Sequence, residues 1–170
     1  MEIVPGLPEH APAIAEIHVE AWQSAYQGIV PDVVLAALSV ERREEYWRTA
    51  LAEGNTQVLV ARSANTVVGW VAFGACRDDG APGDAGELWA IYISPRSWSR
   101  GVGQALWLRA RNSLVEQGYR TASLWVLDDN QRAIRFYRAA GFQPEPSSTK
   151  EIAMGGKSLN ETRYIAALDG

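Results

Sequence analysis

The stretch that decides the fold is residues 87–104, ELWAIYISPRSWSRGVGQ, which reads as a buried strand, a tight glycine turn and the start of a helix. A helix entered through glycines presents unpaired backbone N–H groups and the positive end of its dipole to an anion. The stretch therefore predicts a cradle for a phosphate-bearing ligand, with the carboxylate of Glu87 upstream of it.

The glycine pair Gly101 and Gly103 is weak evidence by itself, because glycines also serve ordinary turns. The stretch lacks the third glycine and the acidic residue of a dinucleotide fingerprint, and it lacks the Lys-Ser/Thr of a P-loop. Neither NAD nor ATP is favoured as the ligand.

The length and charge of the chain limit its class. With 170 residues, 47% of them hydrophobic, it is long enough for a real core, and we expect a single domain over residues 1–170. The N-terminus, with Glu2, Pro5 and Glu9, lacks a basic segment leading into an apolar signal run, so a cytoplasmic location is expected. A formal net charge of −4 disfavours nonspecific attraction to nucleic acid or to anionic membranes, and neither partner is expected.

Metal chemistry is not expected either. The lone Cys76 excludes an intramolecular disulfide and a cysteine-cluster metal site, and the two histidines, His10 and His18, are too isolated to form one. Seven tryptophans are many for this length, so some are expected to line a cavity or an interface, and a homodimer is left open.

Hydrophobic periodicity and turn residues predict an α/β order of elements. The expected order is a strand at 3–4, a helix ending near Tyr26, helices at 33–38 and after the capping residue Ser39, a hairpin of strands 57–62 and 66–73, strand 87–93, a helix from the glycine turn to Gly118, strand 121–127, a helix ending before Gly141, and strands 150–154 and 159–168. The strand-helix-strand-helix run implies a parallel crossover.

A second motif lies about thirty residues beyond the glycine turn, at residues 130–142, NQRAIRFYRAAGF. It resembles the Asn-x-x-Ala-x-x-x-Tyr-x-x-x-Gly-Phe helix of the GCN5-related N-acetyltransferase (GNAT) family, and the glycine turn resembles that family's acyl-CoA-binding turn. The resemblance covers nearly the entire chain. It implies an α/β fold with a mixed, mostly antiparallel central sheet of about seven strands, a splayed parallel pair within it, and flanking helices.

The resemblance also implies acetyl-CoA as the acyl donor and locates its binding residues. Backbone amides of the turn would hold the pyrophosphate, while Trp98 and Ser99 depart from the residues usual at their positions, so binding rests on the amides. Strand 87–93 would meet the pantetheine arm, and the second motif would complete the site. The implied cofactor-binding residues are Ile91, Tyr92, Ile93, Trp98, Ser99, Arg100, Gly101, Val102, Gly103, Gln104, Asn130, Ala133 and Phe136.

Two residues align with the family's catalytic positions. An amine is almost fully protonated near pH 7, so acetyl transfer needs a proton acceptor, and Glu87 matches the family's general base, acting directly or through a water. Its competing interpretation is an exposed Glu that ends an acidic loop. Tyr137 matches the acid that protonates the departing thiolate. A strand bulge within residues 90–93 would supply an N–H to the oxyanion.

The acceptor site lies outside both motifs. Trp22 and Tyr26 recur on one face of the first helix and are predicted to line the acceptor pocket, although aromatic residues at helical spacing are more often core. The net charge slightly favours a cationic acceptor. We therefore expect an N-acetyltransferase that acts through a tetrahedral intermediate on a small-molecule or peptide amine. A noncatalytic acyl-CoA sensor is the alternative, and an enzyme with a longer acyl group or a hydroxyl acceptor is a third possibility.

Overall fold

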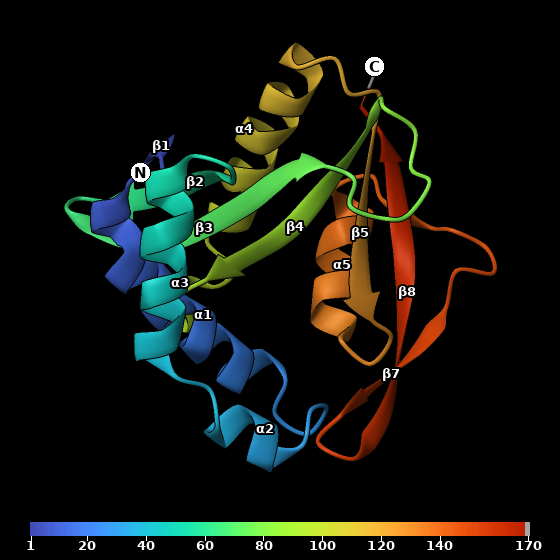
Figure 1. Ribbon diagram of the computed structural model, residues 1–170, viewed down its shortest axis with the longest axis horizontal. Helices are drawn as coiled ribbons and strands as arrows, with labels where there is room; N and C mark the ends of the chain where they lie inside the picture. The colour runs from blue at the N-terminus through green and yellow to red at the C-terminus, as the bar shows by residue number, and fades with distance from the viewer. Residues whose placement is uncertain (169–170) are drawn as a thin grey trace.

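A mixed sheet runs through the molecule, and helices cover both of its faces, as the computed structural model shows (Figure 1). The structure describes residues 1–168, and within them the sheet has eight strands in the order β1-β2-β3-β4-β5-β8-β6, with β7 paired to β8. Every pairing is antiparallel except that of β4 with β5.

The N-terminal elements agree with the order expected from the sequence. They are β1 (Glu2–Pro5), α1 (Ala11–Ala25), α2 (Asp32–Ala36), α3 (Val40–Glu53), β2 (Gln57–Ser63), β3 (Thr66–Ala75) and β4 (Ala85–Ile93). Ser39 caps α3 as expected, because its side chain accepts a hydrogen bond from the Arg42 amide. Gly54 ends the same helix in the left-handed conformation.

The C-terminal elements carry one strand that the sequence did not predict. They are α4 (Val102–Glu116), β5 (Thr121–Leu127), α5 (Gln131–Ala139), β6 (Gln143–Pro144), β7 (Lys150–Met154) and β8 (Lys157–Ala167). The extra strand β6 has only two residues, too few to show an alternating pattern, and it raises the strand number to eight rather than about seven.

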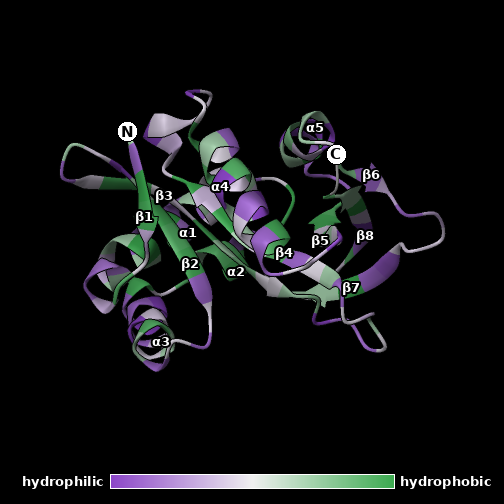
Figure 2. Ribbon diagram, turned by 90° about the horizontal axis from the view of Figure 1, so that it is seen from above, coloured by the Kyte–Doolittle hydropathy of each residue, from purple (hydrophilic) through white to green (hydrophobic). Residues whose placement is uncertain are grey.

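The two faces of the sheet bury separate apolar clusters. Figure 2 shows α4 and α5 on one side of the sheet and α1 and α3 on the other. The first side is filled by Leu106, Leu114 and Phe142, all fully buried. On the second side, Trp70 is fully buried and its Nε1 donates a 3.1 Å hydrogen bond to the carbonyl oxygen of Ile14 in α1, which satisfies the polar atom of a core tryptophan.

The parallel strands β4 and β5 pair only at their beginnings. Their register runs from Ala85 opposite Thr121 to Glu87 opposite Ser123, and beyond this point the strands diverge (Figure 1). Against β3, the strand β4 has a bulge in which Trp89 is the extra residue between Leu88 and Ala90. The bulge was expected within residues 90–93, and it lies one residue earlier, at Trp89, next to the start of the splay.

None of the helices within residues 1–168 combines the length and the apolar character that crossing a membrane requires. Over the same residues, no three His, Cys, Asp or Glu side chains gather in a group able to hold a metal ion. Cys76 is partly buried, with its Sγ 3.6 Å from the Ser123 hydroxyl oxygen.

Candidate active site

A cavity of about 670 Å³ lies where β4 and β5 separate, and it is bounded by α4, α5 and the end of α1. Most of the site residues expected from the sequence meet there, although they come from three separate segments of the chain. Those that line the cavity are Tyr26, Ile91, Tyr92, Ile93, Trp98, Ser99, Gly101, Val102, Gly103, Gln104, Asn130, Ala133, Phe136 and Tyr137.

Three of the expected site residues lie outside the lining of this cavity. Arg100 is exposed on the turn, and Trp22 packs behind Tyr26 with the two rings edge to face at 4.7 Å. Glu87 is buried nearby, with only 4% of its surface exposed. The structure thus brings Tyr26 but not Trp22 to the cavity wall.

The glycine turn forms an open helix N-terminus. Gly101 is the N-cap residue of α4 with φ at +81°, and Ser99 is also left-handed, with φ at +61°. The left-handed conformation costs Gly101 little, because glycine has no Cβ, whereas Ser99 adopts it at some energetic cost. Because Gly101 has no side chain to cap the helix, the amides of the first turn of α4 are left for a ligand.

The turn is held against α5 by close packing. A Cβ atom on Gly103 would lie 3.2 Å from the Phe136 ring, which is tighter than ordinary van der Waals contact, so glycine at this position lets the first turn of α4 pack on that ring. Trp98 donates a 2.9 Å hydrogen bond from Nε1 to the Ile93 carbonyl oxygen, and the guanidinium of Arg132 lies 3.6 Å from the centre of its ring. Trp98 therefore covers the turn.

Two basic residues of the cavity wall were missed by the sequence analysis. Arg132 and Arg135 lie three residues apart on α5, which places them on one face of the helix, and both line the cavity. Partial burial, followed by the charge of Arg135, lowers the pKa of Arg132. Asn130 was the signal in the sequence that could have located these two arginines. It caps α5 by accepting a 3.3 Å hydrogen bond from the Ala133 amide, and both arginines follow it closely on the same helix.

Tyr137 lies on the inner face of α5, packed between Phe136 and Phe142. Burial, and to a smaller extent the neighbouring Tyr26, raises the pKa of Tyr137 well above its usual value. The hydroxyl therefore stays protonated at neutral pH. A protonated hydroxyl inside the cavity can donate a hydrogen bond or a proton to a group that develops negative charge.

Glu87 is tied to a neighbouring arginine. Its Oε1 accepts a 2.9 Å hydrogen bond from the Arg77 amide, and Nε of Arg77 lies 3.3 Å from the same oxygen. The Arg77 guanidinium also lies over the ring of Trp89, 4.5 Å from its centre. Since Glu87 does not line the cavity, a proton that moves from the cavity to the Glu87 carboxylate needs an intervening water.

Trp89 and Trp125 form a further part of the wall that the sequence analysis did not identify. They project from the two diverging strands, and both indole N–H groups are held by the same segment, residues 75–78. Trp89 donates to the carbonyl oxygen of Ala75, and Trp125 donates to Oδ1 of Asp78, each at 3.1 Å. These bonds fix both rings at the narrow end of the splay, just beyond the point where β4 and β5 stop pairing.

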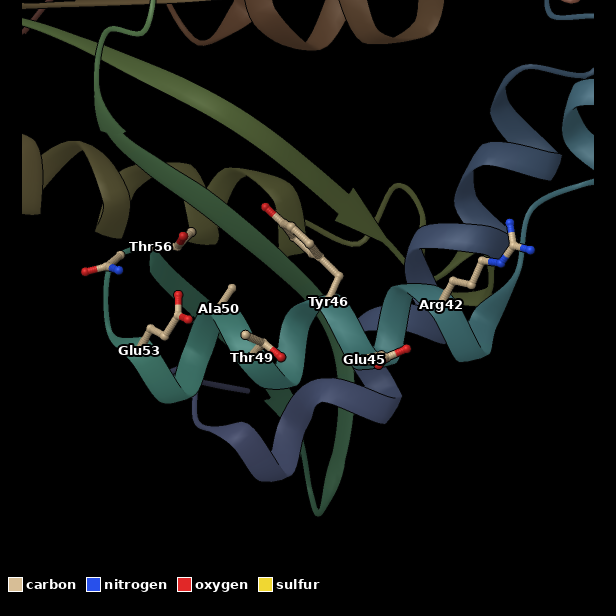
Figure 3. Close-up of a pocket in the computed structure, with 8 residues that line it drawn as sticks. Arg42, Glu45, Tyr46, Thr49, Ala50, Glu53 and Thr56 are labelled. Atoms are coloured by element: carbon tan, nitrogen blue, oxygen red, sulfur yellow. The ribbon is translucent and has the colours of Figure 1, made fainter.

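A second hollow of about 480 Å³ lies on the outer side of α3 (Figure 3). It is lined by Arg42, Glu45, Tyr46, Thr49, Ala50, Glu53, Asn55 and Thr56. Figure 3 shows these side chains standing along one helix and the residues that follow it. Acidic and basic groups are mixed there, so the hollow does not share the organised polar groups of the larger cavity.

The sequence profile of the Acetyltransferase (GNAT) family matches residues 12–142, a stretch that contains both the glycine turn and α5. The chain belongs to this family. Among its relatives, the uncharacterized N-acetyltransferase YuaI of Bacillus subtilis is 31% identical over 149 residues, which cover 87% of this chain and 82% of the relative. The GNAT membership expected from the two motifs is confirmed.

Solved structures share the fold. A paia N-acetyltransferase from Thermoplasma acidophilum, in complex with coenzyme A, superposes with a TM-score of 0.77 at 20% identity, covering 98% of this chain and 99% of that one. For yncA of Salmonella typhimurium, solved with acetyl-CoA, the TM-score is 0.76 at 22% identity over 100% and 95% of the two chains. The GNAT fold, with its mostly antiparallel sheet and one parallel pair, is therefore confirmed.

Proposed function

We propose that this N-acetyltransferase transfers the acetyl group of acetyl-CoA to a primary amine of a small molecule or peptide by direct attack through a tetrahedral intermediate. Acetyl-CoA is the acyl donor. The observation that carries the proposal is the meeting, in one cavity, of the open helix N-terminus at Gly101 and the protonated hydroxyl of Tyr137. An anion-binding end and a proton donor are the two features that a thioester donor with a pyrophosphate needs.

The cavity fits this donor. The amides of Val102, Gly103 and Gln104 would hold the pyrophosphate, and the guanidinium groups of Arg132 and Arg135 would add charge-assisted contacts to phosphate. The pantetheine arm would lie along the free edge of β4 at Ile91 and Ile93, where the splay leaves the strand without a neighbour on the β5 side. Asn130, Ala133 and Phe136 would close the other side.

The acceptor nitrogen gives up two protons, and the leaving sulfur gains one. The ammonium first loses a proton to become a neutral nucleophile. As its nitrogen then bonds to the thioester carbon and the carbon–sulfur bond breaks, the nitrogen loses its second proton and the sulfur is protonated. Tyr137 would supply the proton to sulfur, because its hydroxyl is un-ionised at neutral pH and lines the cavity. Glu87 would take up the amine proton through a water, since its carboxylate is buried beside the cavity rather than in its wall.

The test is release of free CoA thiol from acetyl-CoA in the presence of a panel of amines and peptides. The Tyr137→Phe variant is expected to lose about a hundredfold in kcat, the order expected for a general acid, with acetyl-CoA affinity nearly unchanged. Tyr46→Phe, on the exposed outer side of α3, is the matched control and should behave as the unchanged protein. Thiol release that is equally fast in the Tyr137→Phe variant would remove Tyr137 from the mechanism, and acetyl-CoA binding without any thiol release would indicate a sensor.

A further inference from the structure

Trp89 and Trp125, at the narrow end of the splay, each have a cation of the protein over the ring. The Arg77 guanidinium lies 4.5 Å from the centre of the Trp89 ring, and the Lys150 ammonium lies 4.0 Å from the centre of the Trp125 ring. Both rings line the cavity, and the two cations lie over them just outside its lining. The cations come from the β3–β4 loop and from β7.

The charged side chains around the two indole rings are not equally exposed to solvent. The Arg77 side chain is 57% exposed and its partner Glu87 only 5%, while the Lys150 side chain is 53% exposed and its partner Glu161 19%. Asp78 and Glu145, with side chains 30% and 38% exposed, share Arg163 as their basic partner. Each of these four carboxylates is therefore ion-paired, and the two most exposed side chains of the pairs, Arg77 and Lys150, are both positive.

Arg77 and Lys150 also keep hydrogen-bond donors for a ligand. A guanidinium has five N–H donors, and at Arg77 two nitrogens contact Glu87, at 3.3 and 3.5 Å. An ammonium has three donors, and the contact of Lys150 with Glu161 is 3.5 Å long. An anionic group could thus bind either side chain without breaking its existing ion pair.

We infer that the acceptor is an amine that also bears a carboxylate, such as an amino acid, with Arg77 and Lys150 as its specificity-determining residues. The inference rests on the proposed acetyl transfer at this site. The amine would enter between Trp89 and Trp125 toward the acetyl group, the apolar part of the acceptor would pack on the indoles, and its carboxylate would stay at the level of the two cations. The two exposed cations would then act on the acceptor at short range, whereas the net charge of −4 by itself favours a cationic acceptor.

The experiment compares amino acids with their amides in the thiol-release assay. Phenylalanine is paired with phenylalaninamide and methionine with methioninamide, and spermidine serves as the cationic acceptor. The amide keeps the shape but removes the negative charge, and it lowers the pKa of the amine, so a preference for the acid cannot arise from a more available lone pair. We expect kcat/KM to be at least about tenfold higher for the acid than for its amide, as one charge-assisted contact would give.

The variant Lys150→Met keeps a long apolar side chain on Trp125 but removes the charge. It should lower the acid-to-amide ratio severalfold by raising KM for the acid, with KM for acetyl-CoA unchanged, and Arg48→Met on α3 is the control for loss of an exposed, ion-paired cation. The inference would be overturned by a preference for amides or spermidine, or by an acid-to-amide ratio that is unchanged in both Lys150→Met and Arg77→Met. Either result would leave the proposed acetyl transfer standing. If no thiol is released with any of these amines or with any peptide, the proposed function is overturned, and this inference with it.

Discussion

At the scale of single residues, Glu87 shows how a neighbour changes the chemistry that a sequence position implies. Its carboxylate accepts a hydrogen bond from the backbone N–H of Arg77 and forms an ion pair with the guanidinium of the same residue. Glu87→Gln keeps an oxygen for the backbone bond and removes the charge needed to accept a proton. We expect kcat at pH 7 to fall about a hundredfold, with partial recovery at high pH, where the amine is already neutral. Steady-state pH profiles of both proteins measure this.

The thermal midpoint of the Glu87→Gln variant, compared with that of the unchanged protein, shows whether the Arg77 loop is still held. If the rate loss is the same at every pH, Glu87 does not accept the proton, and water alone carries it away from the amine. The residue would then serve to anchor the segment 75–78 that holds Trp89 and Trp125.

At the scale of elements, the contact of α4 with α5 depends on the absence of a side chain at Gly103. A Cβ there would meet the Phe136 ring at 3.2 and 3.3 Å, and the larger side chain in Gly103→Val would push α5 and Tyr137 away from the turn. Overpacking of this kind costs about 1–3 kcal/mol. We expect lower stability in urea and at least about tenfold weaker acetyl-CoA binding by calorimetry, a loss of about 1.4 kcal/mol.

The matched substitution for this element is Gly83→Ala in the β3–β4 loop, where an added Cβ has no heavy atom within 4 Å among the neighbours described. It should leave both stability and binding unchanged. Normal acetyl-CoA affinity in Gly103→Val would mean that the two helices do not need this close approach to form the site.

At the scale of the whole molecule, the core between the sheet and α1 makes stability depend on pH. His18 is stacked with Trp22 and Trp70 and tilted against Tyr92, and neither of its ring nitrogens has a hydrogen-bond partner among residues 1–168. Burial, followed by the charge of Arg43, lowers the pKa of His18 to about 4. The folded protein therefore resists a proton that the unfolded chain accepts below about pH 6.5.

The stability that His18 contributes is present above pH 6.5 and is lost as the pH falls toward 4. Between pH 7 and pH 4 this one residue should lower the free energy of unfolding by about 3 kcal/mol. Urea unfolding at a series of pH values should show a shallower decline in His18→Gln than in the unchanged protein. Parallel declines in the two proteins would show that His18 does not govern the acid sensitivity.

Much of the fold followed from local sequence signals. Strand β5 spans Thr121–Leu127 as expected from its apolar run, and the Ser39 cap is confirmed by its bond from the Arg42 amide. The two-residue β6 was missed because so short a strand forms only by pairing with β8. The bulge lies at Trp89 rather than within residues 90–93, because the register between β3 and β4 is set by pairing and not by composition.

By itself, the sequence determined the family, the order of elements and the glycine turn, because backbone conformation and helix capping depend on residues close together in the chain. Only the tertiary structure decided which side chains share the cavity. It brought Arg132 and Arg135 to the turn, paired Glu87 with Arg77, and placed Trp89 and Trp125 under two cations. These contacts are made between different elements of the fold, and the cavity that they border lies where β4 and β5 separate after Glu87.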